Sequence, residues 1–388
     1  MINRLIKPSE NNSLLLFGAR GTGKSTWLKS EFLQNKTHLY INLLDPDEEA
    51  RLSRSPGELL QQIDALVDKP AWVVIDEVQK IPKLLDVVHM ILESERKILF
   101  ALTGSSARKL RRGQANLLAG RAFVYHLHPF THIELGEGFL LDEVLSWGSL
   151  PKIFSLENAA DKQLFLKTYT QTYLKEEIVA EQVVRKLDPF RQFLNVCAQH
   201  NGEVINYSSL ARDVGVETVT AQSYFQILED TLIGYLLPAY HRSLRKRQGQ
   251  NPKFYFFDLG IKRQLDGTIL QPPVEGTYGY GKNFEHFVIV EIIRLNDYYG
   301  KDFRLSYLRT KDGAEIDLIV ERPGAPVALI EIKSKKTMSE LDLRTLKVFK
   351  KDFGNQTEAY CLSQDPVAKL IDGVHVLPWQ EGIKALFS

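Results

Sequence analysis

The stretch LFGARGTGKSTW, residues 16–27, decides the fold of the first part of the chain. Gly18, Gly23, Lys24 and Ser25 match the pattern G-x-x-x-x-G-K-[ST] in full. In this pattern the backbone N–H groups cradle phosphates, the lysine reaches the β and γ phosphates, and the hydroxyl binds Mg²⁺. A helix that begins near Lys24 would also present its N-terminus to the anion. The motif predicts a phosphate-binding loop with ATP and Mg²⁺ as cofactors. The residues expected to contact the nucleotide are Gly18, Ala19, Arg20, Gly21, Thr22, Gly23, Lys24, Ser25 and Thr26.

Short apolar runs follow one another along the first 130 residues. They lie at residues 14–17, 38–42, 72–75 and 98–102. Apolar runs of this length are typical of strands that are buried on both faces of a parallel sheet. The stretches between them have helical spacing, and alternation of strands and helices predicts an α/β domain. We assign this domain, a parallel-sheet P-loop NTPase, to residues 1–133.

An acidic pair ends the third apolar run. Asp76 and Glu77 follow the strand pattern in WVVIDEVQ, residues 72–79. An Asp at this strand end typically belongs to the Mg²⁺ shell, so Ser25 and Asp76 are the expected metal-binding residues. The adjacent Glu77 is well placed to orient or deprotonate the attacking water. The pair therefore predicts an ATP hydrolase.

The run ILFALTGSS, residues 98–106, places polar side chains next to the same site. In a P-loop sheet its strand lies beside the phosphate-loop strand, so Ser105 or Ser106 can touch the γ phosphate or the water. Either serine could instead cap the next helix. Arginines follow, and one of them could complete a transition-state clamp in cis or in trans, with Arg121 as our candidate. The others, which are either solvated or in contact with a polyanion, are Arg108, Arg111 and Arg112.

Several motifs together have the order of a known family. GARGTGKST, IDEVQK, LTGSSARKL, LLAGR and LHPFTHIEL succeed one another within residues 18–135. With them the chain resembles a widespread bacterial and archaeal family in which an AAA-type ATPase module is joined to a C-terminal domain of unknown function, DUF4143. WGSLPKIF and the YLKEEI segment also fit, and the resemblance covers essentially the whole chain.

The rest of the chain divides into three parts, which makes the fold class α/β multidomain. Residues 134–189 have mostly helical patterns and predict a helical segment packed on the first domain. Residues 190–270 predict a winged-helix domain, because LARDVGVETVT between two helical patterns looks like a helix-turn-helix and two strand patterns follow it. Val204 to Asn206 would be a short strand before the first of these helices. Residues 276–388 mix helix and strand patterns and predict a third α/β domain.

Four polar residues of the last part have the order of a PD-(D/E)xK nuclease core. Glu285 lies in a predicted helix, Asp317 in a predicted strand, and Glu331 and Lys333 in the next strand. Glu331 and Lys333 share a face because side chains alternate along a strand. Asp317 and Glu331 are the expected ligands of Mg²⁺ or Mn²⁺, which can activate water beside a phosphate, while a lysine stabilises developing charge. The competing interpretation is a nuclease-like fold used only for binding or regulation.

The stretch HRSLRKRQ, residues 241–248, places basic side chains at the predicted wing tip. Arg242, Arg245, Lys246 and Arg247 are the candidates for phosphate contacts that do not read sequence. This predicts DNA or RNA as a partner. The alternative is a solvated hairpin tip in a packing module.

Composition limits the class of protein. With 49 basic and 48 acidic residues the net charge is +1, so no global field indicates a polyanionic partner. Cys197 and Cys361 are too far apart in sequence to suggest a zinc or disulfide framework, and few cysteines fit a reducing cytoplasm. No apolar run resembles a leader or a membrane span.

Two hypotheses of different classes follow. The first is a cytoplasmic Mg²⁺-dependent ATPase coupled to a nucleic-acid-directed C-terminal domain with nuclease chemistry. The second is a nucleotide-controlled switch whose inactive nuclease-like domain binds a protein partner. A homo-oligomer fits either hypothesis, because AAA-type modules often assemble.

Overall fold

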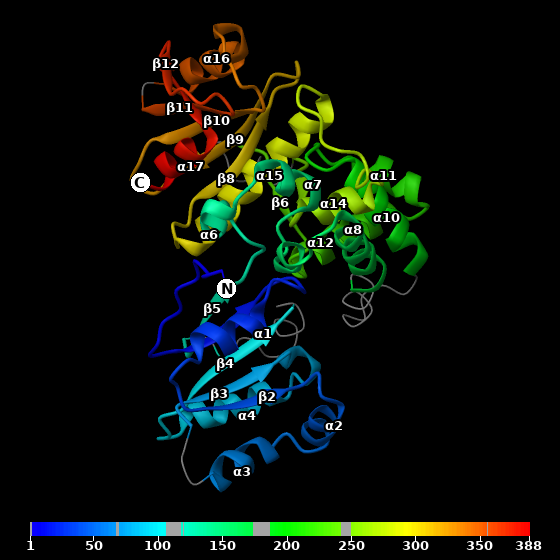
Figure 1. Cartoon of the computed structure of the whole chain (residues 1–388), viewed down its shortest axis with the longest axis vertical. Helices are drawn as coiled ribbons and strands as arrows, with labels where there is room; N and C mark the ends of the chain where they lie inside the picture. Colours follow the sequence, from blue (N-terminus) through cyan, green and yellow to red (C-terminus); the bar gives the residue numbers. More distant parts are fainter. Residues whose placement is uncertain are drawn as a thin grey trace.

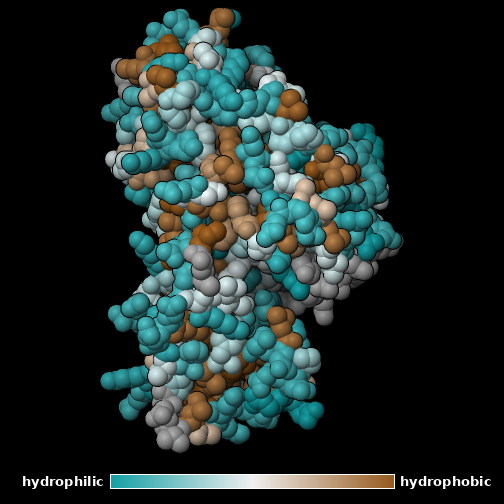
Figure 2. Space-filling model, viewed as in Figure 1, coloured by the Kyte–Doolittle hydropathy of each residue, from teal (hydrophilic) through white to brown (hydrophobic). Residues whose placement is uncertain are grey.

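The computed structural model describes residues 2–66, 70–105, 118, 120–173, 187–241, 250–354 and 356–388. Figure 1 shows one sheet at each end of the molecule, with helices of the middle part packed beside the long helix α15 (Tyr278–Tyr298). On the face in Figure 2, hydrophilic side chains dominate and hydrophobic ones form small separate patches. None of the helices in the described ranges is long and apolar enough to cross a membrane.

The first domain is built on a five-stranded sheet in the order β2-β3-β4-β1-β5. Its strands are β1 (Ser13–Phe17), β2 (His38–Asn42), β3 (Trp72–Asp76), β4 (Leu99–Gly104) and β5 (Ala122–His126). All neighbouring strands are parallel. This confirms the predicted α/β domain with a parallel sheet. The strand that carries the polar LTGSS end, β4, lies between β1 and β3.

Two hydrophobic clusters cover the two faces of this sheet. Leu15 and Phe17 of β1 belong to one cluster, and Leu14 and Leu16 belong to the other. Because successive side chains point to opposite faces, a strand covered on both sides must be apolar throughout. The covering helical elements are α1 (Lys24–Trp27), its π-helical continuation Leu28–Phe32, α2 (Pro46–Arg54), α3 (Glu58–Ala65) and α4 (Leu84–Glu93).

The middle part is largely helical and contains one hairpin. Its elements are α6 (His132–Leu135), α7 (Leu141–Trp147), α8 (Ala159–Thr168), α10 (Leu187–Gln199), α11 (Tyr207–Val214), α12 (Thr218–Asp230), β6 (Gly234–Leu237), β7 (Lys253–Phe256) and α14 (Leu259–Leu265). Asn206 caps the start of α11, and Gly215 ends it in a left-handed conformation. The predicted hairpin is present as the antiparallel pair β6–β7; β7 lies within the predicted PKFYFFD strand, but β6 begins and ends earlier than the predicted LLPAYHRS strand, residues 236–243. The strand expected at residues 204–206 is reduced to one bridge between Val204 and Lys253.

The C-terminal part packs α15 against a six-stranded sheet in the order β12-β13-β11-β10-β9-β8. Its strands and later helices are β8 (Arg304–Arg309), β9 (Glu315–Glu321), β10 (Val327–Lys333), α16 (Arg344–Phe353), β11 (Thr357–Ser363), β12 (Lys369–Ile371), β13 (Val374–Pro378) and α17 (Trp379–Phe387). The order helix, three strands, helix, strand agrees with the prediction. The sequence patterns gave no indication of β12, β13 or α17.

The segment of residues 127–135, which is LHPFTHIEL, joins the first domain to α15. His128 Nε2 lies 2.7 Å from Asp297 Oδ2, near the end of the helix. Earlier on the same helix, Glu291 Oε1 accepts the backbone N–H of His132 at 2.6 Å. The structure thus explains why these residue types occur directly after β5: they hold the two ends of the molecule together.

Candidate nucleotide site and C-terminal carboxylate centre

The predicted phosphate loop follows β1, and α1 begins at Lys24. Gly21 and Gly23 have φ angles of 82° and 93°, a region that side-chain-bearing residues rarely adopt. A Cβ atom on Gly18 would lie 2.4 Å from the carbonyl oxygen of Leu127. The loop therefore requires glycine at these three positions, as a backbone cradle for phosphate does.

Lys24 is buried and is held by the loop itself. Its Nζ donates to the carbonyl oxygens of Gly18 at 2.8 Å and Ala19 at 3.5 Å. No carboxylate among the described residues lies within ion-pair distance of Lys24. A cation whose acceptors are neutral carbonyls can exchange them for phosphate oxygens. These residues fit the phosphates of a nucleotide, which they would bind and orient.

Asp76 lies at the end of β3 and accepts two hydrogen bonds from hydroxyl groups. Tyr40 donates to Oδ2 at 2.6 Å, and Thr103 donates to Oδ1. Burial, and then the bond to Asp76, raise the pKa of the Tyr40 phenol, so it stays a neutral donor. Both partners orient the carboxylate without neutralising it. Asp76 and Ser25 are thus suited to hold Mg²⁺, which would supply positive charge to the phosphates.

Glu77 follows Asp76 in a strained conformation. Its φ angle is 63°, which places a non-glycine residue in the left-handed region. Its backbone N–H donates to Thr103 Oγ1 at 3.1 Å. Gln79 Nε2 donates to the Glu77 carboxylate and, at 3.0 Å, to Ser105 Oγ. Strain of this kind occurs where a side chain is held in place for function.

Sequence reasoning missed the roles of Tyr40, Thr103 and Gln79 at this site. The polar end of β4 was the only sequence feature that could have indicated Thr103. Tyr40 lies within an ordinary strand pattern, and nothing in that pattern distinguishes it from a packing residue.

The expectation that Arg121 completes the site in cis is wrong. Arg121 forms an ion pair with Glu93 and directly precedes β5. In the parallel register Ala122 lies opposite Ser13, whereas the phosphate loop follows Phe17 at the other end of β1. Four residue steps of a strand separate these ends by about 13 Å. Several other predicted residues lie outside the described ranges: Ser106, Arg108, Arg111, Arg112, Arg242, Arg245, Lys246 and Arg247.

Glu285, Asp317, Glu331 and Lys333 come together, and we call them the C-terminal carboxylate centre. Glu285 lies on α15, Asp317 on β9, and the other two on β10. The antiparallel register of β9 and β10 brings Asp317 beside Glu331, and Asp317 Oδ2 accepts the backbone N–H of Ile332 at 2.8 Å. Lys333 Nζ lies 2.6 Å from Glu331 Oε1. The predicted juxtaposition is therefore present.

Lys253, from β7 of the middle part, enters this centre and was not predicted. Its side chain is 1% exposed, and its Nζ lies 3.5 Å from Glu285 Oε1 and pairs with Glu315. Tyr255 on the same strand donates to Glu285 Oε1 at 3.0 Å, and Lys282 Nζ lies 2.9 Å from Glu285 Oε2. The one sequence feature that could have indicated this role is a lysine directly before the aromatic run FYFF.

The protonation of the centre follows from burial and these charges. Burial, and then repulsion by Glu331 and Glu285, raise the pKa of Asp317 well above its ordinary value. Burial acts in the same direction on Glu285, but Lys253 and Lys282 outweigh it and lower its pKa. Asp317 is the acid that most readily keeps a proton, while Glu285 stays ionised between two lysines.

The centre does not fit a divalent metal ion in this arrangement. Within the described ranges, no three His, Cys, Asp or Glu side chains are grouped so that they could hold one. Glu331 Oε2 is buried and has no hydrogen-bond partner there, which is the single feature in favour of an added cation. The predicted metal ligands are thus adjacent, but an ammonium group already lies among the carboxylates.

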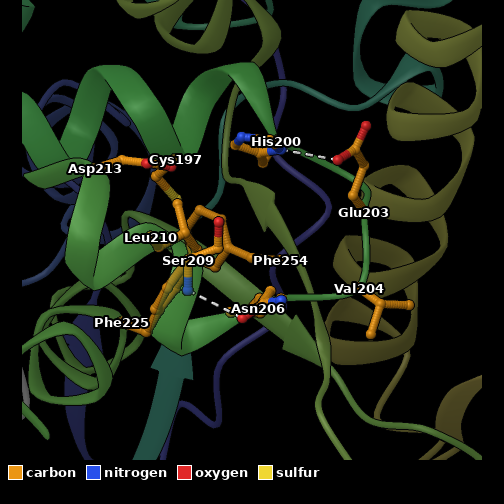
Figure 3. A pocket seen from close by; sticks show the side chains of 11 residues that line it. Cys197, His200, Glu203, Val204, Asn206, Ser209, Leu210, Asp213, Phe225 and Phe254 are labelled. Atoms are coloured by element: carbon orange, nitrogen blue, oxygen red, sulfur yellow. Dashed lines mark hydrogen bonds and ion pairs between the residues drawn. The ribbon is translucent and has the colours of Figure 1, made fainter. Parts of the chain in front are cut away.

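A separate pocket of about 190 Å³ lies between α10, α11 and β7 (Figure 3). Three of its polar side chains already have partners: His200 Nδ1 lies 2.9 Å from Glu203 Oε2, and Asn206 Oδ1 accepts the N–H of Ser209 at 3.0 Å. Burial raises the pKa of the Cys197 thiol well above its ordinary value, so it is not a thiolate nucleophile. We do not assign chemistry to this pocket.

Family models match the two domains that carry these sites. Residues 10–136 match an AAA domain, and residues 280–381 match a domain of unknown function, DUF4143. The chain joins an AAA domain to a DUF4143 domain. The resemblance stated from the motifs is thereby confirmed. A second domain of unknown function, DUF8612, matches residues 138–270, which lie between them. The AAA domain implies that the chain uses a nucleotide.

Relatives with similar sequences extend over most of the chain. An uncharacterized protein of Mycobacterium tuberculosis is 28% identical over 332 residues, which cover 84% of this chain and 71% of that protein. An uncharacterized protein of Methanocaldococcus jannaschii is 24% identical over 403 residues, covering 91% and 82%. A solved structure of Drosophila ORC bound to GC-rich DNA and Cdc6 aligns at 11% identity and a TM-score of 0.22, over 66% of this chain and 85% of that chain.

Proposed function

We propose that this chain is a Mg²⁺-dependent ATPase that acts as a nucleotide-controlled switch on its DUF4143 domain. The observation that carries the proposal is the environment of Asp76, a buried carboxylate to which the hydroxyl groups of Tyr40 and Thr103 donate, beside a glycine cradle and Lys24. Negative charge that is oriented but not neutralised, next to a phosphate loop, is what binding of Mg·ATP requires.

The residues of the AAA domain then have distinct roles. Lys24 binds the phosphates, Ser25 and Asp76 hold the metal ion, and Glu77 accepts the proton of the attacking water. Gln79 is a positioning residue, because its amide joins Glu77 to Ser105. Arg121 remains a candidate only in trans, which would require a homo-oligomer.

The link between the phosphate loop and α15 supports a switch. Arg4 donates to the carbonyl oxygen of Thr22 in the loop at 2.9 Å, to Glu134 at 2.8 Å and to the Tyr298 hydroxyl at 3.0 Å. Tyr298 ends α15, and Glu285 lies near the start of the same helix. A rearrangement of the loop on nucleotide binding therefore acts directly on the helix that carries part of the C-terminal carboxylate centre.

ATP turnover by the Lys24→Ala variant tests the proposal. We expect turnover to be abolished, because the ammonium that neutralises the β and γ phosphates is lost. Lys83→Ala, an exposed lysine at the start of α4, is the matched control and keeps wild-type turnover. Unchanged turnover in Lys24→Ala would refute the assignment of the site.

A second candidate function is a nuclease directed at DNA or RNA, which would need Mg²⁺ or Mn²⁺ as cofactor and therefore another position of Lys253 than the one described above. The observation that favours it is the partnerless Glu331 Oε2 beside Asp317. Its test is cleavage of plasmid and single-stranded substrates with Mn²⁺, with loss of cleavage in Asp317→Ala. Absence of cleavage across several substrates would refute this second candidate and leave the nucleotide-controlled switch as the proposed function.

The proposal that the basic stretch of residues 241–248 binds nucleic acid is supported by the sequence alone. Neutralising Arg245, Lys246 and Arg247 should remove salt-dependent binding of nucleic acid. Equal binding by this variant and the wild type would remove the reason for assigning a nucleic-acid contact to the stretch.

A further inference from the structure

We infer that Lys253 is the built-in cation of the C-terminal carboxylate centre, so that the middle part of the chain keeps this centre free of divalent metal. The inference goes beyond the proposed ATPase and does not depend on it. It makes the centre a lysine-neutralised cluster in which an ammonium group lies among the carboxylates that a nuclease core would offer to a metal.

The burial of Lys253 is the first argument. With 1% of its side chain exposed, its ammonium has almost no access to water. A charge in such a place is very unfavourable unless carboxylates compensate it. Glu285 lies 3.5 Å away, Glu315 forms an ion pair with it, and attraction to these acids and to Asp317 keeps the Lys253 pKa raised despite burial. Lys253 and the centre therefore stabilise each other.

The backbone holds the lysine in this position. Tyr307 on β8 donates from its hydroxyl to the carbonyl oxygen of Asn251 at 2.6 Å, two residues before Lys253. The same tyrosine accepts the N–H of Tyr240 at its carbonyl, also at 2.6 Å. Both strands of the β6–β7 pair are thus attached, at the end where Leu237 faces Lys253, to β8, the edge strand of the C-terminal sheet. These contacts hold the backbone at Lys253 next to the C-terminal carboxylate centre.

The balance of charges at the C-terminal carboxylate centre supports the same inference. The side chains concerned are the carboxylates Glu285, Glu315, Asp317 and Glu331, the lysines Lys253, Lys282 and Lys333, and at the rim the half-exposed Arg309, 3.7 Å from Glu315. Counted in their charged forms, the four carboxylates face four cationic groups. A divalent ion would add charge to a cluster that is already compensated. Removal of Lys253 would recreate the need for a cation.

The test measures Mn²⁺ binding to the full chain without nucleotide, by titration calorimetry. We expect no binding in the wild type that depends on Asp317. Lys253→Met should gain a Mn²⁺ site, and Lys253→Met/Asp317→Asn should lose it again. Lys262→Met is the control, because Lys262 of α14 pairs with Asp266, 2.7 Å away and directly after the helix, and not with the centre. Lys253→Arg keeps the positive charge and should gain no site.

Three results would overturn the inference. One is Mn²⁺ binding by the wild type that Asp317→Asn removes. This result is decisive even if Lys253→Met does not fold. Another is a folded Lys253→Met that binds no Mn²⁺, and the third is a gain of the same site in Lys253→Arg. None of these depends on ATP turnover, so failure of the ATPase proposal, seen with Lys24→Ala, is distinguishable from failure of this inference.

Discussion

In the AAA domain Asp76 accepts hydrogen bonds from Tyr40 and Thr103, whereas in the DUF4143 domain Glu285 lies between the ammonium groups of Lys253 and Lys282. Both carboxylates are buried, and both belong to sequence patterns that predict a metal site. Hydroxyl donors orient a carboxylate and leave its charge available to a cation, while ammonium groups compensate that charge. The neighbours of an acidic motif therefore decide whether its negative charge needs a metal ion.

Lys24 and Lys253 differ in the same way as these two carboxylates, in the charge of their partners. Lys24 is held by carbonyl oxygens of its own loop, which compete weakly with phosphate. Lys253 is held by two carboxylates, those of Glu285 and Glu315. One lysine is thus available to a ligand and the other is a part of the folded structure.

The largest expected effect separates chemistry from binding in the AAA domain. Glu77→Gln should lower ATP turnover by about 10²–10⁴-fold, because the group that accepts the proton of water is lost. Nucleotide affinity, measured by titration, should stay near that of the wild type. Glu93→Gln, which breaks the pair with Arg121 far from the loop, should leave turnover unchanged. A comparable loss in Glu93→Gln would contradict our placement of Arg121.

The next effect concerns stability and compares the two lysines directly. Lys253→Met should lower the free energy of unfolding by about 3–5 kcal/mol, because carboxylates buried around it lose their partner. Lys24→Met should lower it by about 1 kcal/mol, since only hydrogen bonds to carbonyl groups are lost. Urea unfolding of both variants gives the two values. Equal losses would mean that the two lysines do not differ as the contacts indicate.

A smaller effect tests the hydroxyl donors of Asp76. Tyr40→Phe should weaken the Mg²⁺ dependence of ATP turnover by about 10–100-fold, as removal of a partner that orients a metal ligand does. The measurement is turnover against Mg²⁺ concentration at saturating ATP. Tyr125→Phe is the control, because Tyr125 lies on β5 and its hydroxyl accepts a hydrogen bond from the backbone N–H of Ser9. An unchanged Mg²⁺ dependence in Tyr40→Phe would show that this bond does not support the site.

The smallest effect is a pH dependence of stability at the C-terminal carboxylate centre. Burial first, and then Glu331 and Glu285, raise the pKa of Asp317, so the folded chain keeps a proton that the unfolded chain has released above about pH 4. The stabilisation is complete below that pH and is lost as pH rises, by about 1 kcal/mol per pH unit within the window. The Asp317→Asn variant does not lose this stabilisation. Its free energy of unfolding relative to that of the wild type should therefore increase from about pH 4 upwards.

Thermal unfolding at several pH values measures this difference. Asp312→Asn, in an exposed turn before β9, is the control and should follow the wild type at every pH. A constant difference between Asp317→Asn and the wild type would contradict the shifted pKa.

The parts predicted best are those whose residues are neighbours in sequence. The phosphate loop needs glycines at fixed steps and a lysine at the start of a helix, and all of these lie within residues 18–25. The parallel sheet was predictable because continuous apolar runs are required of strands buried on both faces. By contrast β12, β13 and α17 were missed: β12 has only three residues and none of them is buried, and α17 begins directly after β13 without a loop between them.

Residue spacing alone predicts the AAA domain, its loop and the acidic pair Asp76–Glu77, and it places Asp317 beside Glu331 if their strands pair in register. These features depend on short-range spacing and on the strict alternation of strand residues. Only the tertiary structure decided that Arg121 lies at the wrong end of β5, and that Lys253 enters a centre 32 residues or more away in sequence. The physical reason is that the net charge around a carboxylate is set by groups from several elements, and their convergence is a property of packing that local sequence patterns do not encode.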